Sequence, residues 1–125
     1  MAEPTLRAFL RGDIDAANFR HADHVRMGFE ILQHHDFPNA AVAFAGALKQ
    51  IAARAAPGKY HETITLAFLS LIAERQALGA HTDFESFAAA NPDLMYASVL
   101  QRWYAPARLM SDVARKTFVL PDVAR

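Results

Sequence analysis

The stretch Ile64-Thr65-Leu66-Ala67-Phe68-Leu69-Ser70-Leu71-Ile72-Ala73 is the longest apolar run in this chain of 125 residues, and only Thr65 and Ser70 interrupt it. The run lies within a predicted helix over residues 60–78. A helix that is apolar on nearly every side is surrounded by other elements. The run is also far shorter than the roughly 20 apolar residues of a membrane span. The sequence therefore predicts a central helix in a helical protein.

Apolar residues recur in the rest of the chain at spacings of three and four, which is typical of amphipathic helices. Further helices are predicted over residues 5–11, 22–35 and 39–55. Gly12 ends the first of them, and Pro57-Gly58 is a strong stop after the third. Asp15 is expected to cap a brief helical turn between the first two.

The last third of the chain carries weaker patterns. A cap at Thr82 or Asp83 predicts a short helix over about residues 84–87. Asn91-Pro92 places an N-cap before a proline at the first helical position, which predicts a helix over residues 92–104.

A final short helix is expected after Pro106, up to about residue 115, followed by an extended segment over residues 118–122. No repeat, low-complexity tract or linker divides the chain. The prediction is an all-α fold in which residues 1–125 form a single helical domain. It is a bundle of about five to six helices, with an extended C-terminal tail lying across it.

Composition excludes several classes of protein. Thirteen basic and thirteen acidic side chains cancel, so no net charge favours nucleic acid or an anionic membrane. The absence of cysteine excludes disulfides, thiolate ligands and a cysteine nucleophile. Glu3 and Pro4 stand where a signal peptide has a basic start and an apolar run. We therefore expect a cytoplasmic protein that binds neither nucleic acid nor a membrane.

Three histidines stand near the starts of two predicted helices. Phe19-Arg20-His21-Ala22-Asp23-His24 places two of them three residues apart, and Lys59-Tyr60-His61-Glu62-Thr63 places the third at the start of helix 60–78. Helical spacing puts all three imidazoles on the core-facing stripes of their helices. If the two helices pack with these ends together, the three rings meet at one end of the core.

This arrangement predicts a metal site. Imidazole is the commonest protein metal ligand, and three imidazoles leave a coordination position open for water or substrate. We therefore expect His21, His24 and His61 to bind a divalent transition metal, with zinc, iron, copper and nickel all compatible. The positive start of a helix also keeps a histidine neutral, which is the form that binds metal. Glu62 is the candidate catalytic residue, as a group that moves protons. The candidates for contacting substrate or orienting the site are Asp23, Tyr60, Thr63 and Thr65.

A structural role for the same histidines is the alternative. A histidine on an apolar helix face is commonly a partly buried residue that hydrogen-bonds to backbone groups, and a pair spaced by three residues arises often by chance. Asp23 likewise fits the stabilisation of a positive helix start. These alternatives stay open at the level of sequence.

Motifs absent from the chain exclude further functions. The sequence contains no GxGxxG or GxxxxGK[ST] phosphate loop, no HExxH, no EF-hand loop and no GxSxG. The Glu-x-x-His repeat of di-iron bundles is absent too. Nucleotide-dependent and serine-hydrolase activities are therefore disfavoured.

The F-x-H-x-x-H element of residues 19–24, the K-Y-H-E-T-I-T element of residues 59–65 and the segment Phe118-Val119-Leu120-Pro121-Asp122 occur together. In this combination the chain resembles a group of small bacterial helical proteins of uncharacterised activity. The resemblance covers most of the chain. It implies His21, His24, His61 and Glu62 as site residues, surrounded by Tyr60, Thr63 and Thr65, and implies no particular reaction.

Two kinds of function follow from these patterns. The first is a small metal-dependent enzyme whose three-histidine site is open to water or to a small-molecule substrate. The alternative is a non-catalytic metal carrier, a ligand sensor or a small subunit of a larger complex. The sequence does not decide whether the protein is an enzyme. Alanine-rich faces on helix 39–55 are compatible with a homo-oligomer.

Overall fold

The computed structural model describes residues 5–123, so Glu3 and Pro4 lie outside the described residues. The α-helices are α1 (Leu6–Leu10), α2 (His21–Ile31), α3 (Phe37–Ala55), α4 (Glu62–Gly79), α5 (Phe84–Ala90), α6 (Pro106–Leu109) and α7 (Asp112–Lys116). Three 3-10 segments complete the described chain: η1 (Ala16–Asn18), η2 (Pro92–Met95) and η3 (Ala97–Arg102). Residues 5–123 contain no β-strand, which confirms the all-α prediction. None of the described helices is long and apolar enough to cross a membrane.

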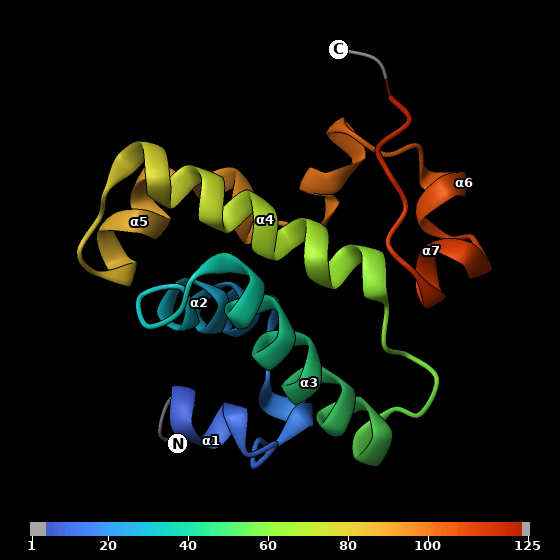
Figure 1. The fold of residues 1–125 in the computed structure, drawn as a ribbon, viewed down its shortest axis with the longest axis horizontal. Coiled ribbons are helices and arrows are strands. Elements are labelled where there is room, and N and C mark those ends of the chain that lie inside the picture. The colour runs from blue at the N-terminus through green and yellow to red at the C-terminus, as the bar shows by residue number, and fades with distance from the viewer. Residues whose placement is uncertain (1–4, 124–125) are drawn as a thin grey trace.

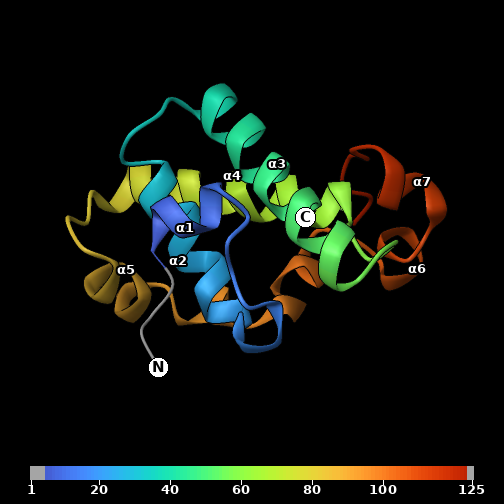
Figure 2. The ribbon, with the colours of Figure 1, turned by 90° about the horizontal axis from the view of Figure 1, so that it is seen from below.

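Helix α4 is the central element, as its apolar sequence predicts. It contacts α2 and α3 on one side and η3 and α7 on the other, an arrangement visible in Figure 1. The apolar side chains that it buries are Phe68, Leu69, Leu71 and Ile72. Figure 2 shows α5 near one end of α4, with α6 and α7 near the opposite end.

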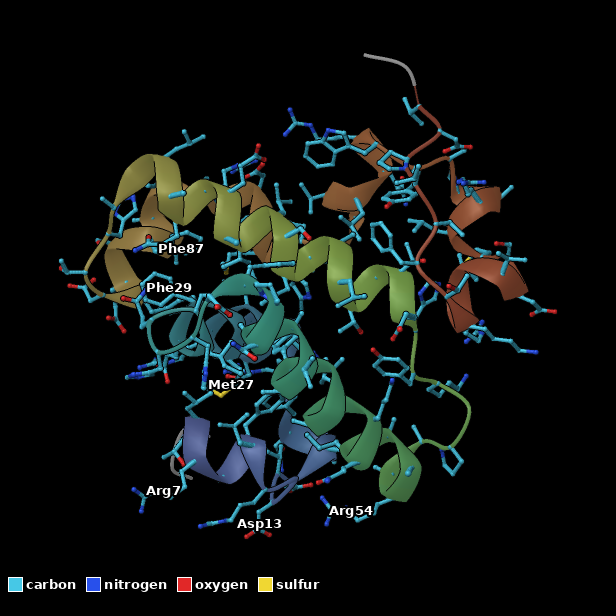
Figure 3. All side chains as sticks on the ribbon, viewed as in Figure 1. Arg7, Asp13, Met27, Phe29, Arg54 and Phe87 are labelled. Atoms are coloured by element: carbon cyan, nitrogen blue, oxygen red, sulfur yellow. The ribbon has the colours of Figure 1, made fainter. Side chains whose placement is uncertain are left out.

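The core consists of two clusters that meet at α4. One cluster joins α1, α2 and α3 around Phe9, Met27 and Phe44, with Leu69 contributed by α4. The other joins α2, α4, α5 and the C-terminal segments, and it includes Phe29 and Phe87. The rings of Phe29 and Phe87 lie 4.9 Å apart, between centroids, while Met27 lies on the side of α2 that faces α1 (Figure 3).

Short polar side chains fix where several helices begin. Thr5, Asp36, Asp83 and Ser111 each accept a hydrogen bond from the backbone N–H three residues later. Asp15 caps η1 by accepting from the N–H of Ala17, as predicted. Helix α2 ends at Ile31, earlier than expected, because the chain must turn before Asp36 can cap α3.

Residues 92–104 are a correction, because they form η2 and η3 instead of the predicted helix. The side chain of Asn91 does not cap this segment: its Nδ2 donates to the Phe87 carbonyl and its Oδ1 accepts from Arg75. Arg75 also makes two hydrogen bonds to the carboxylate of Asp93, at 3.0 and 2.8 Å. Tyr96 is extended and separates the two segments. These contacts to α4 and α5 outweigh the local helix preference.

The segment after α7 is extended, as predicted, and lies against the start of α4. Val119 is buried, and its carbonyl accepts a hydrogen bond of 2.8 Å from the Tyr104 hydroxyl. Arg108 Nε donates to the Leu120 carbonyl at 2.7 Å. Thr63, in the first turn of α4, binds the same segment at Thr117 and Val119, so the segment lies on the half of α4 that carries the predicted site.

Candidate functional site

Helices α2 and α4 both begin beside a cavity of about 380 Å³. Its walls come from the region of η1, the start of α2, the inner face of α3, the loop before α4, the first half of α4 and the first residue of η3. The polar side chains that line it are His21, His24, Lys59, Tyr60, His61 and Thr65. The larger apolar ones include Phe19, Phe44, Leu48, Ile51, Ile64 and Phe68. The three predicted histidines thus lie at one cavity.

His61 is the N-cap of α4, and both of its ring nitrogens bind backbone groups. Nδ1 accepts a hydrogen bond of 3.1 Å from the N–H of Ile64. Nε2 lies 2.6 Å from the carbonyl oxygen of Leu109 and must donate to it, since a carbonyl only accepts. This pair of contacts fixes a neutral tautomer and occupies both positions at which His61 could bind a metal. In this arrangement His61 is therefore a structural histidine that hydrogen-bonds to backbone groups, which is the alternative to a metal ligand.

His21 keeps one ring nitrogen for another partner. Its Nε2 donates to the Leu94 carbonyl, 2.9 Å away, which anchors the start of α2 to η2. The ring packs edge-on against Phe68, with 4.8 Å between ring centroids. In the neutral form, Nδ1 then carries a lone pair and can accept a hydrogen bond or bind a metal ion.

His24 has a different environment. No residue within 5–123 forms a hydrogen bond with its ring, which packs against Phe19 with 4.5 Å between centroids. Burial lowers the pKa of His24 to about 4, the neighbouring His21 adds to this effect, and Asp23 opposes it. His24 is consequently neutral at pH 7, with one N–H donor and one lone pair.

The predicted three-histidine metal site is not assembled in this geometry. Among residues 5–123, no three side chains of His, Asp or Glu are placed to hold one metal ion. His61 could join such a site only by giving up its contact with Ile64 or with Leu109. Metal binding by His21, His24 and His61 stays a prediction.

Glu62 lies behind the cavity wall and is not itself a lining residue. Its Oε1 accepts a hydrogen bond of 2.7 Å from the Tyr60 hydroxyl and lies 3.8 Å from Lys49 Nζ. Burial, followed by the hydrogen bond to Glu62, raises the pKa of Tyr60, while a hydrogen bond from Thr65 lowers it. Tyr60 is therefore a protonated phenol at neutral pH, and it separates Glu62 from the cavity.

Asp23 and Thr63 are not among the residues that line the cavity, and both bind backbone groups. Asp23 Oδ2 accepts from the N–H of Arg20 at 2.9 Å, so it caps the start of α2. Thr63 Oγ1 donates to the Thr117 carbonyl at 2.7 Å and accepts from the N–H of Val119 at 3.1 Å. Thr63 therefore holds the C-terminal segment on α4.

Sequence reasoning missed the wall contributed by α3, where Phe44, Leu48 and Ile51 face the histidines. It also missed Lys59, which was read as part of a motif without a role of its own. One sequence pattern does point to the cavity: the small residues Ala52, Ala55 and Ala56 follow the bulky apolar stripe of α3. Small side chains at the end of such a stripe leave space that a ligand can fill.

Comparisons with known protein families, with curated proteins and with solved structures gave no match to this chain.

Proposed function

We propose that this protein binds a small, mainly apolar molecule in the cavity between α2, α3 and α4, with His21 and His24 contacting its polar group. The supporting observation is the combination of a largely apolar wall with two imidazoles that retain unused hydrogen-bonding positions. Cavities of this size and composition are the usual sites for small ligands.

The two imidazoles give this site a definite chemistry. Neutral His24 offers one N–H donor and one lone pair, and His21 Nδ1 offers a second lone pair. A hydroxyl or carbonyl group on the ligand can pair with these atoms, while its body contacts Phe44, Ile51 and Phe68. A neutral imidazole beside a bound molecule is also able to accept a proton from it. The proposal therefore covers both a ligand sensor and an enzyme.

Titration of the protein with 1-naphthalenemethanol and with 1-octanol tests this proposal by NMR. We expect shifts of the His21 and His24 imidazole resonances and of amides on the inner face of α3. Ala52→Leu should abolish them, because Ala52 lines the cavity. Ala53→Leu is the matched control, since Ala53 is exposed on the same helix and is not a lining residue. If neither alcohol shifts these resonances, the proposal is wrong.

A metal ion bound by His21 and His24 is the second candidate, as part of a small metal-dependent enzyme or a metal carrier. It is supported by the neutral state of His24 and by the unused nitrogen of His21, with water completing the coordination. Elemental analysis of protein purified without a histidine tag should then find bound metal. Titration with Zn²⁺ should show binding that His24→Ala removes and His34→Ala retains, since His34 is exposed and is not a lining residue of the cavity. Equal Zn²⁺ binding by both variants would exclude this site.

A further inference from the structure

The charges around the cavity favour one class of ligand. None of the described residues that line it is Asp or Glu, and Lys59 is its one charged lining residue. Lys59 belongs to the loop before α4, is exposed, and therefore lies at the solvent side of the cavity. Within residues 5–123 its ammonium group forms no ion pair, so its charge remains available to a ligand.

The acidic side chains nearest to the histidines are already engaged. Asp23 accepts from the backbone of Arg20, and its Oδ2 lies 3.7 Å from Arg20 Nε. Glu62 accepts from Tyr60 and pairs with Lys49. Both carboxylates therefore have partners on neighbouring residues, although the charge of Asp23 still acts on His24 and raises its pKa.

The lining groups can donate to an anion. His24 carries an N–H that has no partner within residues 5–123, and Lys59 carries three N–H donors. The partial positive charge at the starts of α2 and α4 adds to the same potential, because both helices begin beside the cavity. An amine ligand would find no carboxylate in this wall, whereas a carboxylate would find an ammonium and an imidazole N–H.

We propose that the ligand of this cavity is a small apolar carboxylic acid, bound as its carboxylate by Lys59 and the N–H of His24, with a one- or two-ring or short aliphatic body against the apolar wall. This inference rests on the proposed function, and it names the ligand class for the same site. Charge-assisted hydrogen bonds of this kind are about twice as strong as neutral ones.

Isothermal titration calorimetry at pH 7 and low salt tests the ligand class with two matched series. The first is 1-naphthoate, 1-naphthalenemethanol and 1-naphthylmethylammonium, and the second is octanoate, octanol and octylammonium. In at least one series we expect the carboxylate to bind about tenfold more tightly than the alcohol, and the ammonium to bind most weakly. Raising the salt concentration should narrow the difference, because Lys59 is exposed.

The outcomes separate this inference from the proposed function. If, in both series, the alcohol or the ammonium compound binds as tightly as the carboxylate, the ligand class is wrong and binding in the cavity stands. If none of the six compounds binds, both proposals are wrong. Lys59→Met should lower the affinity for the carboxylate more than the affinity for the alcohol, because Lys59 lines the cavity and its charge acts on the carboxylate alone. Lys116→Met, an exposed substitution on α7, should change neither affinity. A carboxylate preference that is undiminished in Lys59→Met would overturn the inference.

Discussion

The first turns of α2 and α4 bring histidines to the same cavity but hold them in different ways. At the start of α4, His61 uses both ring nitrogens on the backbone of Ile64 and Leu109. At the start of α2, an aspartate caps the helix, so the ring of His24 is not needed there and packs against Phe19. A histidine that caps its own helix uses its ring there and is not available to a ligand. A histidine in a helix that another residue caps can keep its ring available to a ligand.

The largest expected effect is that of His61→Ala on the stability of the protein. The substitution removes the cap from the N–H of Ile64 and the donor from the Leu109 carbonyl. A lost cap costs about 1 kcal/mol, and an unsatisfied partly buried carbonyl costs about 1–3 kcal/mol. We therefore expect the free energy of unfolding, measured with urea, to fall by about 3 kcal/mol.

His61→Asn separates the contribution of the cap from that of the hydrogen bond to Leu109. Asparagine is a good N-cap, but it is too short to reach the Leu109 carbonyl as the imidazole does. It should recover about 1 kcal/mol. If His61→Ala is as stable as the wild type, the assignment of His61 as a structural cap is wrong, and a ligand role for all three histidines regains support.

The next effect concerns pH and follows from the pKa of His24. The unfolded chain takes up this proton near pH 6.5, but the folded protein does so only near pH 4. Between these values the unfolded state binds more protons, so stability is complete above pH 6.5 and decreases as the pH falls to 4. A difference of this size corresponds to a loss on the order of 3 kcal/mol, which urea denaturation at several pH values will measure.

His24→Gln should flatten the stability profile between pH 6.5 and 4, because the amide does not titrate. His34→Gln should leave the profile unchanged, since His34 is exposed. Asp93 adds a loss of its own only at the acid end of this window, because the unfolded carboxyl begins to bind protons as the pH approaches 3.8, while hydrogen bonds to Arg75 lower its pKa in the folded protein. A wild-type profile that is flat down to pH 4 would contradict the buried, neutral state of His24.

Local sequence patterns predicted most of the fold, and they failed where distant residues decide the conformation. The apolar character of residues 64–73 predicted the central position of α4. A cap at Thr82 or Asp83 predicted the start of α5, and the structure has Asp83 as that cap. Residues 92–104 carry a good helix start, yet Asn91 and Asp93 bind Arg75 on α4. No local pattern contains that partner, so the prediction of one helix was wrong.

The position of the candidate site was predictable in part, and the roles of its residues were not. Helical spacing predicted that His21, His24 and His61 lie on core-facing stripes, because such a stripe is a property of each helix alone. Their place at one cavity also required that α2 and α4 pack with their starts together. Whether Nε2 of His21 and of His61 is free for a ligand depends on the carbonyls of Leu94 and Leu109, which lie 73 and 48 residues away in sequence. Those partners become visible only in the folded chain.

A third prediction extends the comparison to the residue beside the His61 cap. Thr63→Val keeps the shape of the side chain but removes the donor to the Thr117 carbonyl and the acceptor for the N–H of Val119. Because Thr63 and Val119 are buried, we expect a loss of about 2 kcal/mol. The Val119 amide should also exchange its hydrogen faster.

Thr82→Val is the matched control for this change, since Thr82 is exposed and should tolerate valine with little effect. If Thr63→Val unfolds at the same urea concentration as the wild type, the C-terminal segment is held by its apolar contacts alone.

The smallest effects test how closely α2 packs on α4 at Gly28, in the second half of α2. A Cβ atom at Gly28 would lie 2.9 Å from Ile72 Cδ1 and 3.3 Å from Leu69 Cδ1, whereas one at Gly46 would meet nothing within 4 Å. We expect Gly28→Ala to destabilise the protein by about 1–2 kcal/mol through overpacking. Gly46→Ala should stabilise it by about 0.5–1 kcal/mol through helix propensity.

The two glycine variants also report on the site through the His24 imidazole. If α2 is pushed away from α4 in Gly28→Ala, water reaches His24 and the burial that depresses its pKa is reduced. An NMR titration should then find the pKa of His24 closer to 6.5 in Gly28→Ala and unchanged in Gly46→Ala. The pKa of His24 could instead be unchanged in both variants while Gly28→Ala is destabilised. That result would mean that packing around Phe19 buries His24, and that the close approach of α2 to α4 does not contribute to its burial.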